Sequence, residues 1–240
     1  MILLDKNVLL TGGSAGIGKE LAILLKREGA NVTLTGRNTK RLVEMENQGF
    51  QVIEADLSTE KGVNNLISQI DSLEFDILIN NAGQSVDHDF RVKIPNPLSA
   101  DRCIYANLQA PIKLITSLVP RLSERPEAAI VNVTSGLAIA PRAAGPIYCA
   151  TKAGLRSYTM ALRKQLEKTN IDVIEILPPV VETQMTAGQN HSKMSPVTCA
   201  EHIIRAIKNS VDEAYIGQTN VLRWVFSISP KLAQKIMLRF

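Results

Sequence analysis

The stretch NVLLTGGSAGIG, residues 7–18, joins a short apolar run to a glycine-rich turn. Apolar residues recur at helical spacing over residues 19–28, and a second apolar run begins at Val32. Strand, turn, helix and strand in this order predict one βαβ unit with a right-handed crossover. Glycines let a phosphate approach the turn closely, and the first N–H groups of the helix attract the anion. The stretch therefore indicates a nucleotide-binding unit at the start of the chain.

Strands and helices continue to alternate along the chain. Further apolar runs predict strands at residues 51–55, 76–80, 128–134, 172–177 and 214–217. Helix patterns predict helices at residues 39–48, 61–70, 99–122, 145–168 and 195–209. This alternation predicts an α/β fold, a doubly wound parallel sheet of the Rossmann type with helices on both faces, in a single domain. We expect Ser58 to cap the helix that follows it and Pro111 to kink the helix that contains it.

Composition and charge narrow the class of protein. The 240 residues carry a formal net charge of +4 and are 45% hydrophobic, which is typical of a globular protein with a slightly basic surface. Three cysteines without metal-ligand spacing favour reduced thiols in a cytoplasmic compartment. The chain shows no signal-peptide pattern and no apolar run of about 18 residues. We therefore expect a cytoplasmic protein that binds neither nucleic acid nor metal.

Two other functions use the same glycine turn. The turn matches G-x-S-x-G, the nucleophile elbow of an α/β-hydrolase, with Ser14 as nucleophile and His191 or His202 as base. This elbow would follow the first strand, which leaves no earlier loop for the second oxyanion donor. The turn also matches a P-loop, but Glu20 stands where Ser or Thr must hold magnesium. The hydrolase remains an alternative, and the P-loop is rejected.

The end of the second strand bears on the cofactor. Arg37 lies there, about 20 residues beyond the glycine turn. In a dinucleotide-binding fold this position meets the adenosine ribose. An acidic side chain favours NAD, whereas an arginine pairs with the 2′-phosphate of NADP. Arg37 therefore favours NADP(H) over NAD(H).

A second group of polar residues follows the strand at residues 128–134. Ser135 ends this strand, and Tyr148 and Lys152 lie four residues apart in the next helix, so that they share one face. They would meet at the carboxyl end of the parallel sheet, where open α/β folds bind ligands. Asn107 lies inside a predicted helix, where asparagine is unfavourable by propensity. Such a residue indicates a functional site or a buried hydrogen bond.

With these motifs in this order, the chain resembles the short-chain dehydrogenase/reductase family over nearly its whole length, and most of all the DltE-like bacterial oxidoreductases. The matching motifs are TGGSAGIG at residues 11–18, DL at 56–57, NNAG at 80–83, Asn107, Ser135 and YCATK at 148–152. The resemblance implies an NADP(H)-dependent oxidoreductase that transfers a hydride between the nicotinamide and a carbonyl or secondary alcohol. It also implies a dinucleotide-binding half up to about residue 135, a catalytic half at about 136–220, and a homodimer or homotetramer.

The resemblance implies four catalytic residues. Tyr148 is expected to act as general acid or base, with Ser135 bonded to the substrate oxygen. Lys152 is expected to hold the nicotinamide ribose and to lower the pKa of Tyr148. Asn107 is expected to hold a water that links Lys152 to solvent. The residues expected to bind the cofactor are Gly12, Ser14, Gly16, Ile17, Gly18, Arg37, Asp56, Leu57, Asn81, Ala82, Gly83, Tyr148, Lys152, Pro178, Val181 and Thr183.

Two positions depart from the family pattern. Pro179 replaces a usual glycine, so the chain after it is expected to follow a different path. Ala15 stands where many NADP-dependent members carry a basic residue, so the preference for NADP rests on Arg37, helped by Asn38. A dinucleotide sensor without catalysis is a further alternative, against which the complete catalytic set argues.

The segments that set the substrate carry no motif. Residues 84–97 and 185–195 are polar and irregular, and the second has the composition of a mobile lid. Residues 221–240 combine apolar residues, among them Trp224 and Phe240, with four basic residues. This segment predicts either a peripheral membrane contact or packing on the substrate pocket or a partner subunit, of which packing is favoured. The apolar tail suggests a lipophilic small-molecule substrate.

Overall fold

Seven parallel strands form the centre of the structure. The computed structural model describes residues 1–92, 94–188 and 192–239, and its strands lie in the order β3-β2-β1-β4-β5-β6-β7. The order of the strands reverses at the β1–β4 pair, and open α/β sheets bind ligands at such a reversal. The predicted doubly wound sheet is therefore confirmed. The strands are β1 (Asn7–Leu10), β2 (Asn31–Gly36), β3 (Gln51–Glu54), β4 (Ile77–Asn80), β5 (Ala128–Val133), β6 (Ile171–Leu177) and β7 (Glu213–Tyr215).

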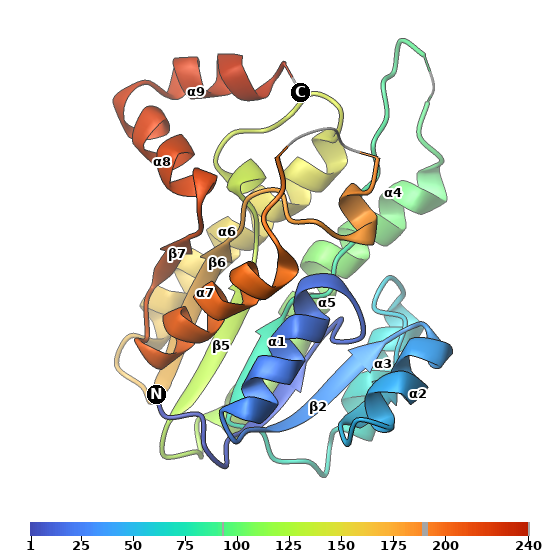
Figure 1. The fold of residues 1–240 in the computed structure, drawn as a ribbon, viewed down its shortest axis with the longest axis vertical. Coiled ribbons are helices and arrows are strands. Elements are labelled where there is room, and N and C mark those ends of the chain that lie inside the picture. Colours follow the sequence, from blue (N-terminus) through green and yellow to red (C-terminus); the bar gives the residue numbers. More distant parts are fainter. Residues whose placement is uncertain (93, 189–191, 240) are drawn as a thin grey trace.

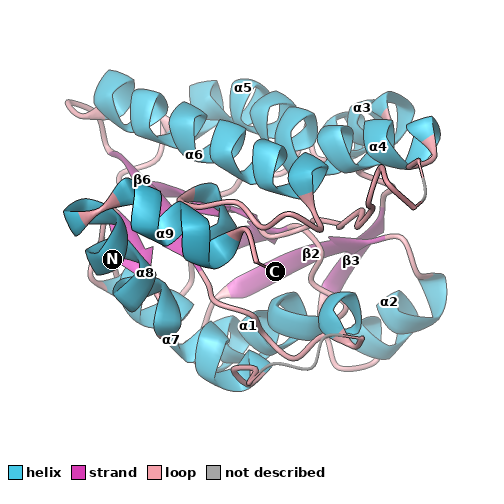
Figure 2. Ribbon diagram, turned by 90° about the horizontal axis from the view of Figure 1, so that it is seen from above, coloured by secondary structure: helices cyan, strands magenta, loops and turns pink. Residues whose placement is uncertain are grey.

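Helices cover both faces of the sheet, as predicted (Figure 1, Figure 2). The layer on one face consists of α1 (Gly16–Arg27), α2 (Thr39–Glu46) and α7 (Pro196–Lys208). The layer on the other face consists of α3 (Glu60–Gln69), α4 (Pro97–Ile104), α5 (Ala110–Leu122) and α6 (Pro146–Leu166). Because both faces of the central strands are buried, β1 and β4 contain unbroken apolar runs, at residues 8–10 and 77–79, rather than an alternating pattern.

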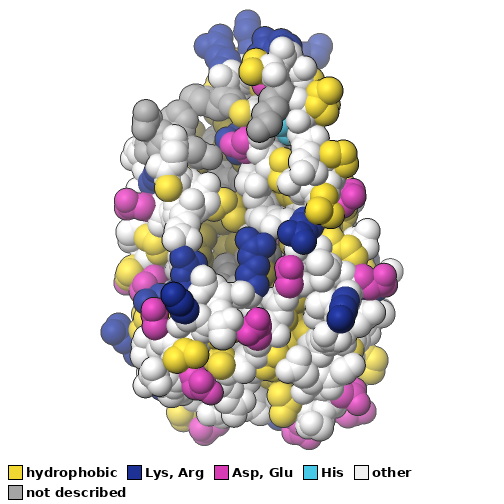
Figure 3. Space-filling view, turned by 90° about the vertical axis from the view of Figure 1, so that its right-hand side faces the viewer, with side chains coloured by type: hydrophobic (Ala, Val, Ile, Leu, Met, Phe, Trp, Pro, Cys, Tyr) yellow, Lys and Arg dark blue, Asp and Glu magenta, His cyan; other side chains and the backbone are white. Residues whose placement is uncertain are grey.

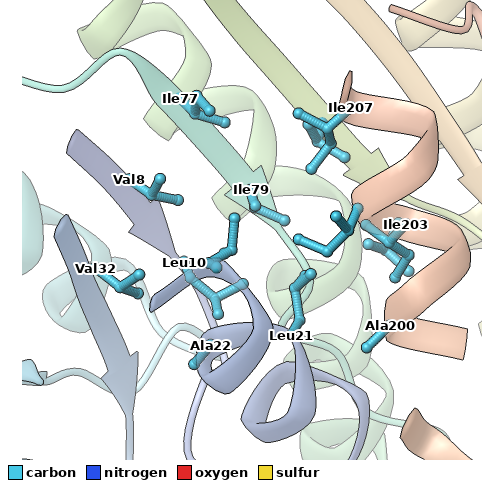
Figure 4. Close-up of a cluster of buried hydrophobic side chains, with 14 of the residues drawn as sticks. Val8, Leu10, Leu21, Ala22, Val32, Ile77, Ile79, Ala200, Ile203 and Ile207 are labelled. Carbon is cyan, nitrogen blue, oxygen red and sulfur yellow. The ribbon is translucent and has the colours of Figure 1, made fainter. Parts of the chain in front are cut away.

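Each layer buries its own half of the core. On the first face, Leu10 of β1 and Ile79 of β4 pack with Leu21 of α1 and Ile203 of α7 (Figure 4). On the other face, Leu78 of β4 packs with apolar side chains of α3, α5 and α6. All five side chains are fully buried, and each contributes about 1.5–3 kcal/mol through removal from water. This packing holds the carboxyl ends of the strands together at one edge.

The glycine turn after β1 brings three elements into close contact. Gly12 has a φ of 67°, and a Cβ there would lie 2.9 Å from the Cα of Ala82, just after β4. At Gly18, in the first turn of α1, a Cβ would lie 2.1 Å from the carbonyl oxygen of Gly12. The Thr11 hydroxyl accepts hydrogen bonds from the N–H groups of Asn81 and Ala82, each at 3.0 Å. Only glycine permits such approach of the backbone.

The long helix predicted at residues 99–122 contains an irregular turn. A π-helical turn, Tyr105–Gln109, separates α4 from α5. Pro111 lies at the start of α5 and has no N–H to donate to the carbonyl of Asn107 four residues earlier. The distortion expected from Pro111 thus takes the form of a widened turn before it. Such turns are frequent at functional sites, and this one carries Asn107.

Two helices follow β7. They are α8 (Gln218–Ile228) and α9 (Pro230–Met237), and Ser229 between them caps α9 by accepting from the N–H of Leu232 at 3.3 Å. The sequence analysis predicted no helix at residues 218–228, so α8 was missed. Both helices lie beyond the carboxyl ends of the strands (Figure 1). Within the described parts of the chain, every helix is too short or too polar to span a bilayer.

A buried ion pair joins α6 to the end of the sheet. Glu175 is fully buried, and its carboxylate accepts from the Thr134 hydroxyl at 2.6 Å and from Arg156 at 2.5 Å. Burial raises the pKa of Glu175, whereas the Thr134 bond and Arg156 act in the opposite direction. Arg156 also donates to Glu213 and Tyr215 of β7. The network therefore connects β5, β6, β7 and α6.

Replacing Arg156 by methionine is expected to destabilise the protein. The change leaves the Glu175 carboxylate buried without its cation, which should lower the free energy of unfolding by about 3–5 kcal/mol. Urea unfolding followed by circular dichroism measures this loss. The matched control is Lys164→Met, which removes an exposed ion pair to Glu167 on the same helix and should change stability by less than about 1 kcal/mol. Equal effects of the two changes would contradict a stabilising role for Arg156.

Candidate active site

A cavity of about 1400 Å³ runs along the carboxyl ends of the strands. A hollow with Lys and Arg side chains at its rim is visible from the side of the molecule shown in Figure 3. All the residues predicted to bind the cofactor line the cavity, as does Ser135, whereas Asn107 does not. The structure therefore gathers the predicted site residues, with that one exception, around a single space.

The glycine turn forms one wall of the cavity. Gly16 begins α1 with a φ of 54°, and a Cβ there would lie 3.0 Å from Cγ2 of Thr183 across the cavity. Gly16, Ile17 and Gly18 all line this wall, so the free N–H groups and the positive end of the α1 dipole face the space. A pyrophosphate requires this close backbone approach and these donors. The wall therefore fits the phosphates of a dinucleotide.

Positive charge lies at the end of the cavity next to β2. Arg37, Asn38 and Arg41 line it together, and the Asn38 side chain caps α2 by accepting from the N–H of Arg41 at 3.1 Å. The sequence analysis missed Arg41, which lies in the first turn of α2. Guanidinium groups bind phosphate oxygens through paired N–H donors. This end therefore fits a ribose that carries a phosphate.

Asp56 lies beside these cations. Its carboxylate accepts from the N–H of Ser58 at 3.0 Å and from the Ser58 hydroxyl at 2.7 Å. Burial alone would raise the pKa of Asp56, but the Ser58 bonds and the charge of Arg37 outweigh burial and lower the pKa. The prediction that Ser58 caps α3 was wrong, because its hydroxyl is bonded to Asp56. Thr59 caps α3 instead and accepts from the N–H of Gly62 at 3.1 Å.

Ser135, Tyr148 and Lys152 meet at the inner end of the cavity. Nζ of Lys152 donates to the carbonyl oxygen of Val133 at 2.7 Å and lies 5.7 Å from the centre of the Tyr148 ring. The Ser135 hydroxyl accepts from the N–H of Leu137 at 3.1 Å, and its interaction with the Tyr148 phenol favours the phenolate form. Lys152 is only 4% exposed. Two hydroxyls and a desolvated cation are thus close to one point of the cavity.

The pKa values of Tyr148 and Lys152 differ from expectation. Burial raises the pKa of Tyr148 to about 12, although the interaction with Ser135 opposes the rise. Burial lowers the pKa of Lys152 to about 8. The pKa of Tyr148 is shifted by burial and by Ser135, Cys149, Cys103 and Arg142, and a lowering of this pKa by Lys152 stays a prediction. Tyr148 keeps its proton at neutral pH.

Asn107 lies behind the cavity wall and is fully buried. Its Oδ1 accepts from the N–H of Gln84 at 2.9 Å, and its Nδ2 donates to the Gln84 carbonyl at 2.9 Å and to the Thr151 hydroxyl at 3.1 Å. These bonds attach the π-helical turn to the loop after β4 and to α6. Asn107 therefore has the buried hydrogen bonds that its position indicated. Its role in a water relay stays a prediction.

Two cavity residues, Asp87 and Arg142, were missed. They form an ion pair across the cavity mouth, and at Gly145 a Cβ would lie 3.1 Å from Nε of Arg142. That Nε is buried and has no hydrogen-bond partner among the described residues. The charge of Arg142 also favours the phenolate form of Tyr148 and so opposes the burial that raises its pKa. No sequence pattern distinguished Arg142 from an ordinary surface arginine.

The segment predicted as a lid is attached to the chain before it. The N–H of Met194 donates to the carbonyl of Val180 at 3.0 Å, and a short parallel bridge pairs Val181 with Met194. Pro179, which replaces the usual family glycine, lines the cavity just before this bridge. Residues 189–191 lie outside the described residues, and lid motion stays a prediction.

The C-terminal helices reach the cavity. Leu222 of α8 and Met237 of α9 line it, so the interpretation that this segment packs on the pocket is confirmed for these two side chains. Leu137 and Met185 line the same space and add to its apolar surface. Phe240 lies outside the described residues.

The described residues do not assemble a hydrolase site around Ser14. Its hydroxyl packs against Gly36, where a Cβ would lie 2.7 Å from Oγ. Among the hydrogen bonds formed by the described residues, none joins Ser14 to a histidine. His202 lies on α7, and His191 lies outside the described residues. The glycine turn instead serves as a wall of the cavity.

Comparisons with known proteins agree with this geometry. A family model described as short chain dehydrogenase matches residues 6–194. An uncharacterized oxidoreductase, DltE, of Bacillus subtilis strain 168 is 41% identical over 189 residues, which are 76% of this chain and 74% of that protein.

Solved structures share the fold. A short chain dehydrogenase of Burkholderia cenocepacia, in complex with NADP, has a TM-score of 0.86 and 22% identity, and the match covers 99% of each chain. L-Sorbose reductase of Gluconobacter frateurii, complexed with NADPH and L-sorbose, has a TM-score of 0.76 and 27% identity. That match covers 90% of this chain and 96% of the reductase.

Replacing Lys152 by methionine is expected to stabilise the protein at neutral pH. The pKa of Lys152 falls from 10.5 to about 8 on folding, so the unfolded state binds more protons between these values and stability rises with pH there. At pH 7 the buried charge costs about 3 kcal/mol, and the lost bond to Val133 offsets about 1 kcal/mol of the gain.

Urea unfolding tests this expectation. Lys152→Met should be more stable than wild type by about 1–3 kcal/mol at pH 7, and the difference should shrink as the pH rises from about 8 to 10.5. Lys168→Met, at an exposed position on the chain after α6, is the control and should change stability by less than about 0.5 kcal/mol. A destabilised Lys152→Met variant would contradict the lowered pKa.

Proposed function

The chain belongs to the short-chain dehydrogenase family, and we propose that it is an NADP(H)-dependent oxidoreductase that interconverts a carbonyl and a secondary alcohol, with Tyr148 as the general acid or base. The observation that carries the proposal is the grouping of Ser135, Tyr148 and Lys152 at one end of a cavity whose other end fits a phosphorylated dinucleotide. A sensor that binds the dinucleotide without reaction would have no need for an acid beside a substrate space.

The cavity walls support NADP(H) as the cofactor. The backbone of Gly12 and Gly16 and the start of α1 would hold the pyrophosphate. Arg37 and Arg41 would bind the 2′-phosphate, which NAD lacks. The L-sorbose reductase, 27% identical to this chain, is a complex with NADPH. When bound, this cofactor supplies or accepts the hydride.

The residues of the chain would control the proton. Because the pKa of Tyr148 is raised to about 12, its phenol is protonated at neutral pH and can donate to a carbonyl oxygen during reduction. The Ser135 hydroxyl, held by the N–H of Leu137, would bond the same oxygen and fix its position. The positive charge of Arg142 lowers the cost of the phenolate that forms.

Lys152 would bind the cofactor next to Tyr148, and Asn107 would position the loop that borders the cavity. Nζ of Lys152 is fixed by the Val133 carbonyl and would bind ribose hydroxyls through its other donors. Asn107 holds Gln84 through both its amide atoms, which positions the loop that borders the cavity. We propose that a water bound near Asn107 connects Lys152 to solvent.

The outer cavity indicates a class of substrate. Leu137, Met185, Leu222 and Met237 give it apolar walls, which favour a small molecule with a lipophilic body. The buried Nε of Arg142 has no hydrogen-bond acceptor among the described residues, and a buried donor normally has one. We infer that the substrate carries a second oxygen acceptor near the reacting carbonyl.

Further properties follow from family membership as proposals. We propose that residues 1–240 form a single domain, with a dinucleotide-binding half up to about residue 135, a catalytic half at about 136–220 and an amphipathic C-terminal segment at 221–240. We also propose that the protein forms a homodimer or homotetramer. We also propose that it works in the cytoplasm and binds no nucleic acid.

Replacing Tyr148 by phenylalanine should abolish most of the turnover. Loss of the proton donor is expected to lower kcat by about 10²–10⁴-fold, while NADPH binding, measured by fluorescence titration, should change by less than about threefold because the ring remains. Activity is screened as NADPH oxidation with ketones, sugars and 3-oxoacyl compounds.

Tyr158→Phe, on the same helix but outside the cavity, is the control. Near-normal turnover of Tyr148→Phe would contradict its role, and a wild type inert to the whole panel would favour the sensor.

Replacing Arg37 or Arg41 by aspartate should reverse the cofactor preference. Each change removes a charge-assisted contact to the 2′-phosphate and adds repulsion, so the ratio of NADPH to NADH affinity should fall by about tenfold or more. Titration of both cofactors measures the ratio. Lys40→Asp, at an exposed position between the two arginines, is the control. An unchanged ratio in both arginine variants would exclude this wall as the phosphate site.

A further inference from the structure

The C-terminal helices expose large apolar side chains to water. Trp224 is 70% exposed and Ile228 is 82% exposed on α8, and Leu232 and Ile236 are exposed on α9. Trp224 and Ile228 are four residues apart and share one face of α8, and Leu232 and Ile236 share one face of α9 in the same way. The other side of α8 and α9 packs on the cavity through Leu222 and Met237. The helices therefore have two apolar sides, of which one is unpartnered.

A second exposed apolar segment lies at the same end of the molecule. Phe90, Val92 and Ile94 are exposed in the loop between β4 and α4, by 69%, 85% and 73%. The earlier part of this loop borders the cavity through Ser85 and Asp87. In Figure 1 this loop and α8–α9 both rise above the carboxyl ends of the strands, on opposite sides. The exposed apolar side chains of both segments thus flank the cavity mouth.

Basic residues lie among the exposed apolar side chains of α8 and α9. After Glu213 the sequence contains no Asp or Glu, while Arg223, Lys231, Lys235 and Arg239 follow. These four account for the whole net charge of +4, since residues 1–213 carry equal numbers of acidic and basic side chains. The Arg223 guanidinium lies over the Tyr215 ring at 4.4 Å. All four basic residues are exposed, and no described carboxylate lies within ion-pair distance of Lys231, Lys235 or Arg239.

The exposed apolar side of α8 and α9 could be covered by a second copy of the chain or by a lipid surface, and the basic residues distinguish the two. In a two-fold dimer the face would meet itself, so three exposed cations of each copy would approach those of the other without an intervening acid. An anionic lipid surface instead offers the opposite charge to Lys231, Lys235 and Arg239, and an apolar layer to the side chains between them. Lysine stems can lie along the apolar layer while the ammonium groups reach the headgroups.

We propose that α8, α9 and the β4–α4 loop dock on an anionic lipid surface, with the mouth of the cavity facing the membrane. Trp224 lies at the depth of the headgroups, where tryptophan is enriched in membrane proteins. A lipophilic substrate then enters between Leu222 and the loop without crossing bulk water. This docking depends on surface residues and does not require the reaction proposed above.

Trp224 provides the measurement, because it is the single tryptophan of the chain. Vesicles of phosphatidylglycerol and phosphatidylcholine should shift its emission to shorter wavelength and sediment with the full-length protein, and brominated lipids should quench it. Vesicles of phosphatidylcholine alone should have little effect. Salt at about 0.5 M should weaken binding strongly, because it screens the cations.

Variants separate the apolar and charged contributions. Ile228→Ser with Leu232→Ser, and Lys231→Gln with Lys235→Gln, should each lower the vesicle partition coefficient by about tenfold or more. The matched control is Val43→Ser with Lys40→Gln, an exposed apolar and a basic residue on α2, which should leave partitioning unchanged. NADPH binding, measured in the absence of vesicles, checks that each variant is folded.

Three results would overturn the proposal. Full-length protein that ignores anionic vesicles at low salt would exclude docking. Partitioning that is unaffected by either double variant would place the contact elsewhere. A dimer in lipid-free solution that Ile228→Ser dissociates, seen by sedimentation velocity, would assign the face to a second copy of the chain. None of these results depends on turnover, so failure here leaves the proposed reaction standing.

Discussion

The burial of a positive charge at Lys152 constrains the rest of the structure. Its ammonium group is removed from water at the junction of β5 and α6, with the Val133 carbonyl as its bonded acceptor. Desolvation of a cation is unfavourable, so the surroundings must be held in place by other interactions. The two core layers and the Glu175–Arg156 pair supply that support at the same edge of the sheet. The packing and the ion pair thus offset the unfavourable burial of the Lys152 ammonium group.

Most of the fold and much of the site could be predicted from local sequence patterns, for a physical reason. Continuous apolar strands and a glycine turn specify backbone geometry over a few residues, and the parallel sheet then brings Ser135, Tyr148 and Lys152 together. Side-chain contacts between distant segments have no such local signature. Arg142 meets Asp87 from 55 positions away, and the direction of the Tyr148 pKa depends on burial, which spacing does not reveal. The prediction for Ser58 failed because a nearby carboxylate competed for its hydroxyl.

The two ends of the cavity are built differently. The cofactor end consists of strand ends, a helix start and a glycine turn, all fixed by the core. The substrate end consists of the β4–α4 loop, the chain after β6 and two terminal helices. Loops and termini change more readily than the scaffold that carries them. One scaffold can therefore keep its cofactor-binding residues while the surface and the substrate end of the cavity change. For this reason the sequence motifs identify the class of reaction but do not identify the substrate.

The π-helical turn Tyr105–Gln109 has a consequence for the history of the chain. Each residue of an α-helix advances the direction of its side chain by about 100°, so deleting one residue from the turn would rotate α4 by that angle relative to α5. Asn107 would then no longer point at both Gln84 and Thr151. Insertions and deletions are tolerated in many surface loops, but this buried helix should keep its length in every descendant that retains the site.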